Sequence, residues 1–272
     1  MAPRTIRAEP WREVWPGSSP ALLQALHILT REGALNADSR RKLKQVLHLV
    51  QLLRPAVEAV LAAREAPVIA DCGAGKSYLG FILYDLILRE AGRGSVVGIE
   101  ARPDLVAAAA TIARDAGFAR VQFLESPIAE ARIDGPVDIV TALHACDTAT
   151  DDALAFALAH EARFVALVPC CQAEAARQLS ESGPHPLRQL WRHPIEARAF
   201  GAHVTDVIRG LVLEAAGYKV RVTEFTGFEH TQKNLLILAE RHQRSNPAAR
   251  AELDRLLQQV PVRPKALAAL GG

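Results

Sequence analysis

The sequence has few cysteines, few aromatic residues and no long hydrophobic run. Four cysteines in 272 residues, with no C-x-x-C pair among them, argue against both a disulfide framework and a structural zinc site. Aromatic residues make up only 5% of the chain, which argues mildly against a platform for stacking bases. Charges interrupt the apolar stretches well short of the roughly 18 residues that a membrane span needs.

A large net charge and a secretion signal are also lacking. The formal net charge is +2, so any surface for nucleic acid must come from local clustering of charge. The opening stretch MAPRTIRAEPWREVWPG has no uninterrupted apolar segment of the kind a signal peptide contains. We therefore expect a soluble, cytoplasmic protein, with a substantial core because half of its residues are hydrophobic.

The spacing of apolar residues divides the chain into three regions. Residues 1–66 show helical spacing and form an N-terminal helical segment, in which Pro55 is expected to interrupt or restart the second helix. In residues 67–240, short apolar strands alternate with helices. Residues 241–272 form a polar tail, in which 250–260 has the pattern of a short helix.

The N-terminal segment carries a local excess of positive charge. Residues 1–66 contain ten Lys and Arg against six Asp and Glu. Arg40, Arg41, Lys42 and Lys44 fall together at the start of one expected helix. They form either an ordinary solvated helix face or a surface that docks the phosphates of a substrate.

The middle region predicts an α/β fold with a Rossmann-like sheet of seven strands. The expected strands are Pro67–Asp71, Ser95–Glu100, Arg120–Leu124, Val137–Leu143, Arg163–Val168, Lys219–Glu224 and Asn234–Glu240. The clearest helices between them are Tyr78–Ala91, Pro103–Ala116 and Thr150–His160. This alternation indicates a mainly parallel sheet with helices on both faces, and the last two strands are expected to be antiparallel because a loop joins them.

The most informative motif is VIADCGAGKS, at residues 68–77. Gly73 and Gly75 allow a tight turn and a close approach of the backbone to a ligand. Asp71 is placed to reach the cationic methionine part of S-adenosylmethionine (SAM), directly or through water. Glu100, 29 residues later at the end of the next strand, is placed to accept hydrogen bonds from ribose hydroxyls.

Other nucleotide-binding loops fit this motif less well. A P-loop requires a glycine at position 70, where the sequence has Ala70, and Asp71 would place negative charge beside the phosphates. A G-x-G-x-x-G fingerprint requires a glycine at Tyr78. A purely structural glycine turn remains an alternative to SAM binding.

Residues after the other strands complete the expected cofactor site. Ser126, Pro127 and Ile128 follow the third strand, where the adenine is expected; Pro127 takes the place of the acidic residue common there, which leaves recognition to backbone groups. The cofactor-binding residues we expect are Asp71, Cys72, Gly73, Gly75, Glu100, Ala101, Ser126, Pro127, Ile128, Leu143 and His144.

The fourth and fifth strands end in LHACD and VPCCQ, and their carboxyl ends converge on the expected methyl donor. Methyl transfer relies on positioning, with a base where the acceptor must lose a proton; His144 and Asp147 are candidates. Alternatively, His144 packs beside the cofactor and Asp147 caps the following helix. Cys170 and Cys171 are either a nucleophile and its neighbour, as in RNA cytosine-C5 methyltransferases, or small residues that shape the pocket.

Together, DCGAGKSYL, LHACD and VPCC resemble a class I methyltransferase-like family with a D-x-G-x-G-K and P-C-C pattern. It includes the domain of glutathione S-transferase C-terminal domain-containing protein and is related to tRNA 2'-O-methyltransferases. The resemblance covers roughly 35–240, through LNADSRRKLKQ, HVTDVIRGLVLEAAGY and FTGFEHTQKNLLIL. It implies SAM binding by Asp71, Gly73, Gly75 and Glu100, and a cysteine-rich turn at Cys170 and Cys171. Ser77 departs from the family, which often has a third glycine there.

We therefore predict a SAM-dependent methyltransferase that acts on RNA, either rRNA or tRNA, with no metal. The expected substrate-binding residues are Arg40, Arg41, Lys44, Arg209 and Lys233. Surface pairing between helix neighbours is the alternative role for Arg209 and its neighbours. Two other functions stay open: methylation of a protein or small molecule, and SAM binding without catalysis.

Overall fold

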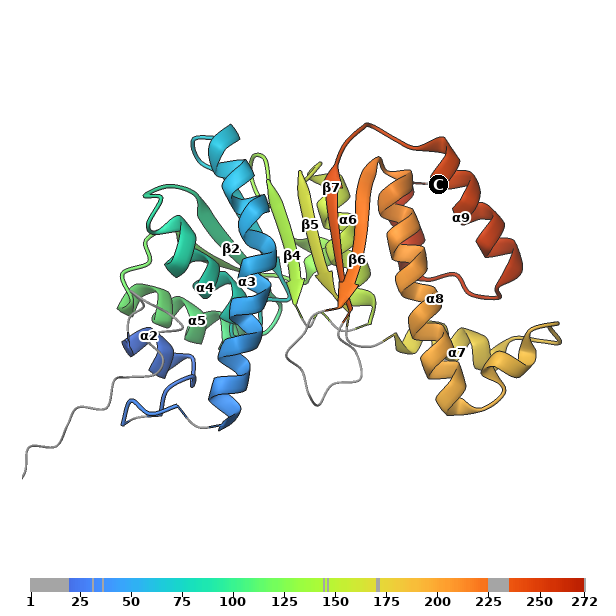
Figure 1. Ribbon diagram of the computed structural model, residues 1–272, viewed down its shortest axis with the longest axis horizontal. Helices are drawn as coiled ribbons and strands as arrows, with labels where there is room; N and C mark the ends of the chain where they lie inside the picture. Colours follow the sequence, from blue (N-terminus) through green and yellow to red (C-terminus); the bar gives the residue numbers. More distant parts are fainter. Residues whose placement is uncertain are drawn as a thin grey trace, which may run out of the picture.

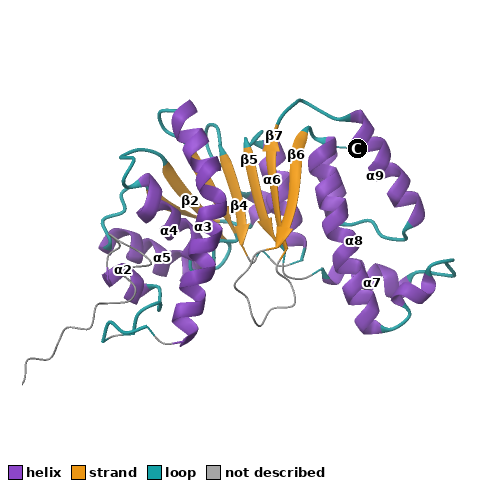
Figure 2. Cartoon of the chain, in the orientation of Figure 1, coloured by secondary structure: helices purple, strands orange, loops and turns teal. Residues whose placement is uncertain are grey.

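The fold is a central sheet with helices on both faces (Figures 1 and 2). A computed structural model describes the residues 20–30, 32–35, 37–143, 145, 147–169, 172–224 and 235–271; at 37–39, 41–42 and 44–46 it describes the backbone alone.

Seven strands form one sheet in the order β3-β2-β1-β4-β5-β7-β6. They are β1 (Val68–Cys72), β2 (Ser95–Glu100), β3 (Val121–Glu125), β4 (Ile139–Leu143), β5 (Phe164–Val168), β6 (Tyr218–Glu224) and β7 (Leu235–Arg241). Strands β1 to β5 pair in parallel, and β7 runs antiparallel to both β5 and β6. The predicted Rossmann-like α/β sheet and its final antiparallel pair are thus confirmed. The strand order reverses between β1 and β4, which is where ligands bind in such sheets.

The longer helices divide between the two faces of the sheet. On one face pack α2 (Pro20–Ala25), α3 (Ala37–Ala63), α4 (Tyr78–Leu83) and α5 (Pro103–Asp115). On the other pack α6 (Thr148–Ala159), α7 (Ala173–Glu181), α8 (Pro194–Ala215) and α9 (Pro247–Gln259). Successive residues of a strand pack into the cores on opposite faces of the sheet: Ile69 packs with the first group of helices, and Ala70 with the second.

Helix α3 runs unbroken through Pro55, contrary to the predicted interruption. Proline lacks the N–H that would bond to the carbonyl of Gln51 one turn earlier. Both residues are exposed and line a groove that is open to solvent, so water can reach that carbonyl. On the opposite side of α3, Leu53, Val57 and Val60 are buried in the core, and this packing keeps the helix continuous.

The helix predicted for Tyr78–Ala91 also differs in detail. After α4 the chain continues as a π-helical turn, η1 (Tyr84–Leu88), in which the N–H of Arg89 donates to the carbonyl of Tyr84 at 2.8 Å. A π-turn inserts one extra residue and shifts the following side chains around the axis. Ile87 and Leu88 are buried as a result of this register.

The C-terminal segment packs against the rest of the protein. Helix α9, close to the short helix predicted there, begins after Asn246, whose side chain accepts a hydrogen bond from the N–H of Ala249 at 3.2 Å. Helix α9 lies against α8, and a 3₁₀ turn, η4 (Lys265–Leu270), lies against α6. Because Leu253 and Val262 are buried in the second core, this segment contributes to the fold.

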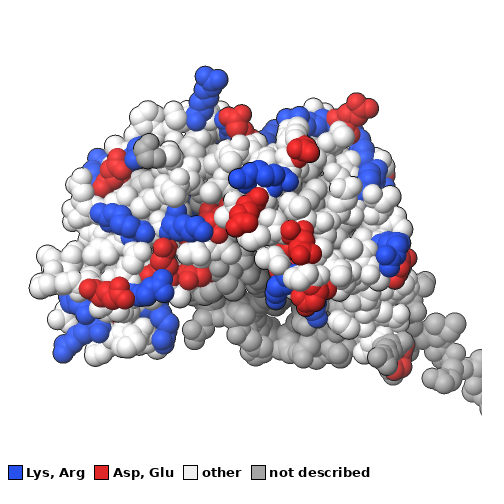
Figure 3. Space-filling view, turned by 180° about the vertical axis from the view of Figure 1, so that it is seen from behind, with Lys and Arg blue, Asp and Glu red and all other residues white. Residues whose placement is uncertain are grey.

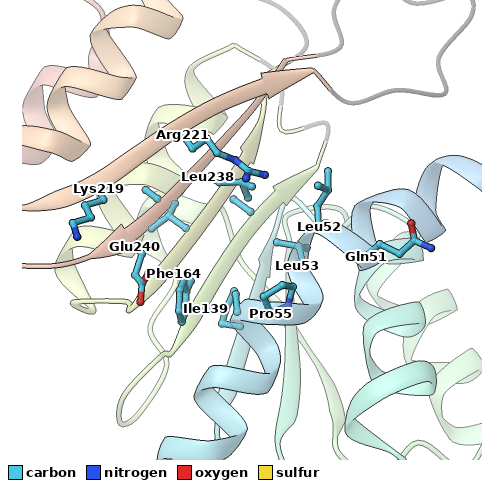
Figure 4. A pocket seen from close by; sticks show the side chains of 14 residues that line it. Gln51, Leu52, Leu53, Pro55, Ile139, Phe164, Lys219, Arg221, Leu238 and Glu240 are labelled. Atoms are coloured by element: carbon cyan, nitrogen blue, oxygen red, sulfur yellow. The ribbon is translucent and has the colours of Figure 1, made fainter.

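The first face of the sheet is partly open beside α3. A groove of about 390 Å³ lies between α3 and strands β4, β5, β7 and β6 (Figure 4). Its floor is apolar, with Phe164 and Leu238, and Arg221 and Glu240 flank it on the β6–β7 side.

Among the described residues, no helix is long and apolar enough to cross a membrane.

Candidate functional site

The glycine loop joins β1 to α4 at the carboxyl edge of the sheet. Gly73, Gly75 and Ser77 have φ angles of 67°, 57° and 53°. For a residue with a side chain, the left-handed conformation costs roughly 1–2 kcal/mol, which is why glycine is favoured at the first two positions. Ser77 has the same backbone conformation, and this accounts for the glycine that the similar family often has there.

The loop lies against the turns that follow β3 and β4. A Cβ added to Gly73 would lie 3.4 Å from the Cβ of Ala145 and 3.7 Å from the Cδ1 of Ile128. At Gly75 the nearest atoms to such a Cβ are 3.9 Å away. Both glycines are half-buried, and Ile128 and Ala145 form the surface beside Gly73.

Asp71, at the end of β1, is buried beneath the glycine loop. Its side chain is buried, and its Oδ1 accepts a hydrogen bond of 2.9 Å from the hydroxyl of Thr141 on β4. Burial raises the pKa of Asp71 to about 7, although hydrogen bonds from Thr141 and the backbone of Gly80 partly offset this effect. In this geometry Asp71 holds β1, β4 and the start of α4 together. The structure shows this supporting contact, and the expected contact with the methionine part of SAM, direct or through water, stays a prediction.

Glu100 is at the end of β2, beside the loop. Its Oε2 accepts from the N–H of Gly75 at 2.8 Å, and its Oε1 accepts from the N–H of Arg102 at 3.1 Å. The guanidinium of Arg102 also donates to both oxygens, from Nε at 2.9 Å and from Nη2 at 3.3 Å. Burial acts to raise the pKa of Glu100, but these hydrogen bonds outweigh it and lower the pKa. The carboxylate is thus charged and faces the glycine loop.

The other expected cofactor residues lie on the strand ends and turns beside the glycine loop. The N–H of Ser126 donates to the carbonyl of Glu100 at 3.1 Å, which holds the turn after β3 beside β2. Ala101 and Pro127 are exposed, and Leu143 is half-buried at the end of β4. Cys72 differs: its side chain is buried in the second core, so only its backbone can face a ligand.

The turn after β4 is joined to the turn after β5. The Oδ1 of Asp147 accepts from the N–H of Glu174 at 3.2 Å, so its carboxylate caps α7 rather than the following helix, α6. Three predicted catalytic residues, His144, Cys170 and Cys171, lie outside the described residues. Of the predicted catalytic residues, Asp147 is described: it lies at the carboxyl edge of the sheet, as expected, and its side chain caps α7.

Arg209 has a different environment from the one predicted for a substrate-binding residue. Its side chain is 1% exposed, and its guanidinium bonds to Asp151 at 2.7 Å, to Asp206 at 3.0 Å and to the backbone oxygen of Asp147 at 3.0 Å. These partners engage the guanidinium inside the protein. We therefore replace the predicted substrate contact of Arg209 with a structural one.

The other predicted substrate contacts are only partly described. Arg40 is exposed near the start of α3. The side chains of Arg41 and Lys44, and the whole of Lys233, lie outside the part of the chain that the structure describes.

Sequence reasoning missed several residues that shape this region. Arg102 follows Glu100 by two positions, so its pairing with that carboxylate was open to inference from the sequence. Thr141 and Asp151 carried no such signal, because their partners, Asp71 and Arg209, are 70 and 58 residues away in the chain.

A cleft adjoins the turn after β5. It encloses about 790 Å³ between the first half of α8 and the ends of β5 and β6. Its lining is mostly apolar, and Ile195 and Val222 within it are 69% and 53% exposed. Arg198, also on α8, adds a positive charge. Clefts of this size and character commonly bind small molecules.

Comparison with protein families gives one match, which covers half of the chain. Residues 41–178 match a methyltransferase domain family, and this stretch contains the glycine loop, Glu100 and the turns after β3, β4 and β5. A search of curated proteins found no match.

Solved structures of similar fold include enzymes with different acceptors. A methyltransferase from Podospora anserina, PaMTH1, is 14% identical, with coverage of 89% of this chain and 100% of that one and a TM-score of 0.49. Magnesium protoporphyrin IX methyltransferase from Synechocystis PCC 6803 is 13% identical, covering 85% and 92%, with a TM-score of 0.44. An rRNA methylase from Streptococcus thermophilus is 10% identical, covering 66% and 89%, with a TM-score of 0.43.

Proposed function

Because the chain belongs to the methyltransferase domain family, we propose that it transfers the methyl group of S-adenosyl-L-methionine to RNA, either rRNA or tRNA. The protein is a SAM-dependent methyltransferase with S-adenosyl-L-methionine as its cofactor. The RNA acceptor and the role of each residue are our proposals.

The residues around the glycine loop fit this cofactor. We assign the backbone of Gly73 and Gly75 to its amino-acid part, because both residues turn with positive φ at the carboxyl edge of the sheet and add no side chain there. We assign the charged carboxylate of Glu100 to the ribose hydroxyls, and Ser126 and Ile128 to the adenine. The cofactor supplies an electrophilic methyl group on a sulfonium; the protein positions the acceptor in line with it.

The position of the basic stretch on α3 is the observation that supports RNA. Helix α3 begins on the side of the sheet where β4 and β5 end, which is the side of the candidate site (Figure 1). Arg40 is exposed there, and Arg41, Lys42 and Lys44 follow in the sequence. On the opposite face of the molecule, Lys and Arg are interspersed with Asp and Glu (Figure 3). Phosphates are therefore expected to dock at the start of α3.

We assign the proton-accepting role to His144, because the carboxylate of Asp147 is engaged by the N–H of Glu174. Cys170 and Cys171 are assigned to shaping the acceptor pocket. Lys233 remains a predicted substrate contact.

The cleft beside α8 favours a second function, methylation of a small molecule. Its mostly apolar lining and its volume of about 790 Å³ suit a compact acceptor, and Arg198, Asp206 and Glu224 add charges of both signs. A protein acceptor has no comparable observation in its favour.

Transfer of tritiated methyl from SAM to an extract of cells that lack the protein tests the proposal. The extract is fractionated into RNA, protein and small molecules after the reaction. We expect label in RNA that is lost with Glu100→Ala and falls steeply as salt rises, because phosphate contacts release counterions. Label confined to small molecules would overturn the RNA proposal in favour of the second function.

A further inference from the structure

The turn after β4 contains a residue in a strained conformation. Asp147 has φ of 54° and ψ of −121°, a combination that residues with a side chain rarely adopt. Such a conformation costs on the order of 1–3 kcal/mol and persists only where the surrounding structure holds it. It occurs at the carboxyl edge of the sheet, next to the candidate site.

Contacts from three helices hold this residue. The backbone oxygen of Asp147 accepts from the Nη2 of Arg209 on α8 at 3.0 Å and from the N–H of Thr150 on α6 at 3.3 Å. Its side chain accepts from the N–H of Glu174 on α7. The hydroxyl of Thr150 bonds to the carbonyl of Ala145 within the same turn.

Arg209 also connects this turn with the one that follows β5. Its Nη1 donates to the Oδ1 of Asp206 at 3.0 Å, and the same oxygen accepts from the Nε2 of Gln172 at 3.0 Å. Gln172 belongs to the turn after β5. The Nε of Arg209 is held by Asp151 on α6 at 2.7 Å. A planar guanidinium can serve these three directions at once, whereas the single ammonium of lysine cannot.

We propose that Arg209 is a positioning residue for methyl transfer: its guanidinium fixes the turn after β4 relative to the turn after β5. Asp147, Gln172 and Asp206, which come from three segments far apart in the sequence, meet in this one network. The proposal rests on the proposed function, because both turns border the acceptor there. Arg209 acts through the backbone of Asp147 and touches neither the acceptor nor the cofactor.

Arg209→Lys is the variant that tests this role, since it keeps the positive charge beside Asp151. We expect amide hydrogen exchange to accelerate at Thr150 and Glu174 while the amides of Gly75 and Ser126 keep their protection. SAM affinity should stay within about threefold of wild type. The kcat on RNA from cells lacking the protein should fall on the order of 10- to 100-fold, the expected effect of a displacement near 1 Å.

A second variant and a control make the test independent of folding. Gln172→Ala removes the hydrogen bond from Gln172 to Asp206 and leaves Arg209 in place, so exchange should rise around Glu174 and not at Thr150. Arg241→Lys alters an ion pair with Glu161 at the opposite edge of the sheet and should change neither turn.

The outcomes separate the two proposals. Unchanged exchange at Thr150 and Glu174 in Arg209→Lys, or a rise that includes Gly75 and Ser126 equally, overturns the positioning role. So does an unchanged kcat. If wild type transfers no methyl to RNA, the proposed function fails, and the exchange pattern still decides whether Arg209 couples the turns.

Discussion

The glycine loop and its partner Glu100 come from adjacent turns on the β1–β3 side of the candidate site, whereas a buried arginine with acidic partners from distant segments holds the β4–β5 side. Gly73, Gly75 and the N–H groups that bond to Glu100 come from adjacent turns of one Rossmann-like unit. Arg209 instead joins segments 58 and 62 residues apart, at Asp151 and Asp147. Under the proposed function, cofactor binding depends on local backbone geometry, and acceptor positioning depends on long-range packing.

The largest effect should come from removing the charge on the β4–β5 side. Arg209→Met leaves Asp151, which is 2% exposed, without its cation, and we expect a loss of about 3–5 kcal/mol in the free energy of unfolding. Denaturant unfolding measures it. Arg250→Met, which breaks an exposed pair with Asp254, should cost no more than about 1 kcal/mol. Equal losses in the two variants would contradict the comparison.

Asp71 is a buried charge on the β1–β3 side, and its effect should depend on pH. Its pKa is raised from 3.8 to about 7, so the folded state binds the proton more tightly than the unfolded state. Stability from this group is full below pH 3.8 and is lost as pH rises through about 7, by at most roughly 4 kcal/mol.

Asp71→Asn removes that titration. The unfolding free energy of wild type should therefore fall relative to the Asn variant as pH rises from 4 to 8. Denaturant unfolding across this range measures the difference, and parallel curves for the two proteins would contradict it.

A glycine pair tests whether loop geometry serves the cofactor. Gly73→Ala and Gly117→Ala both force a side chain into positive φ, at 67° and 70°, so each should cost about 1–2 kcal/mol of stability. Gly117 lies in the turn between α5 and β3, with no atom within 4 Å of an added Cβ. We expect SAM affinity, measured by calorimetry, to fall at least about tenfold in Gly73→Ala only. Equal affinity in the two variants would show that the loop tolerates a side chain.

The smallest effect should come from Arg102. Two of its nitrogens occupy the carboxylate of Glu100, and a ribose would have to displace them. Because the side chain of Arg102 is 64% exposed, Arg102→Ala should tighten SAM binding by less than about fivefold. Arg114→Ala, an exposed arginine on α5, is the matched control. Weaker SAM binding in Arg102→Ala would instead give that guanidinium a direct role with the cofactor.

Much of the fold was predictable because it depends on local pattern. Short apolar segments located all seven strands within two residues of their ends, and their alternation with helices indicated the parallel sheet. Pro55 misled the prediction, since its local effect on the helix is outweighed by the burial of Leu53 and Val57. The π-turn after α4 has no simple sequence signal and depends on packing.

The site was predictable where one short motif supplies it. Gly73, Gly75 and Glu100 lie at the predicted edge because the ends of adjacent parallel strands meet there. Two expectations changed: Asp147 caps α7 rather than α6, and Arg209 is buried among partners of its own. From the sequence, an acidic or basic residue near a site is easily interpreted as a ligand contact. The tertiary structure shows whether its side chain is instead buried and paired within the protein.

By itself, the sequence determined the Rossmann-like sheet, the glycine loop with its acidic partner, and membership in a methyltransferase family. The sheet and the loop follow from periodicity and from backbone conformations that particular residues permit, and the family follows from the resemblance of the motifs and the family match. Only the tertiary structure decided that Asp71 supports the loop from below and that Arg209 joins the turns after β4 and β5. The partner of a buried charge depends on which segments the fold brings together, and it cannot be predicted from the separation of the residues along the chain.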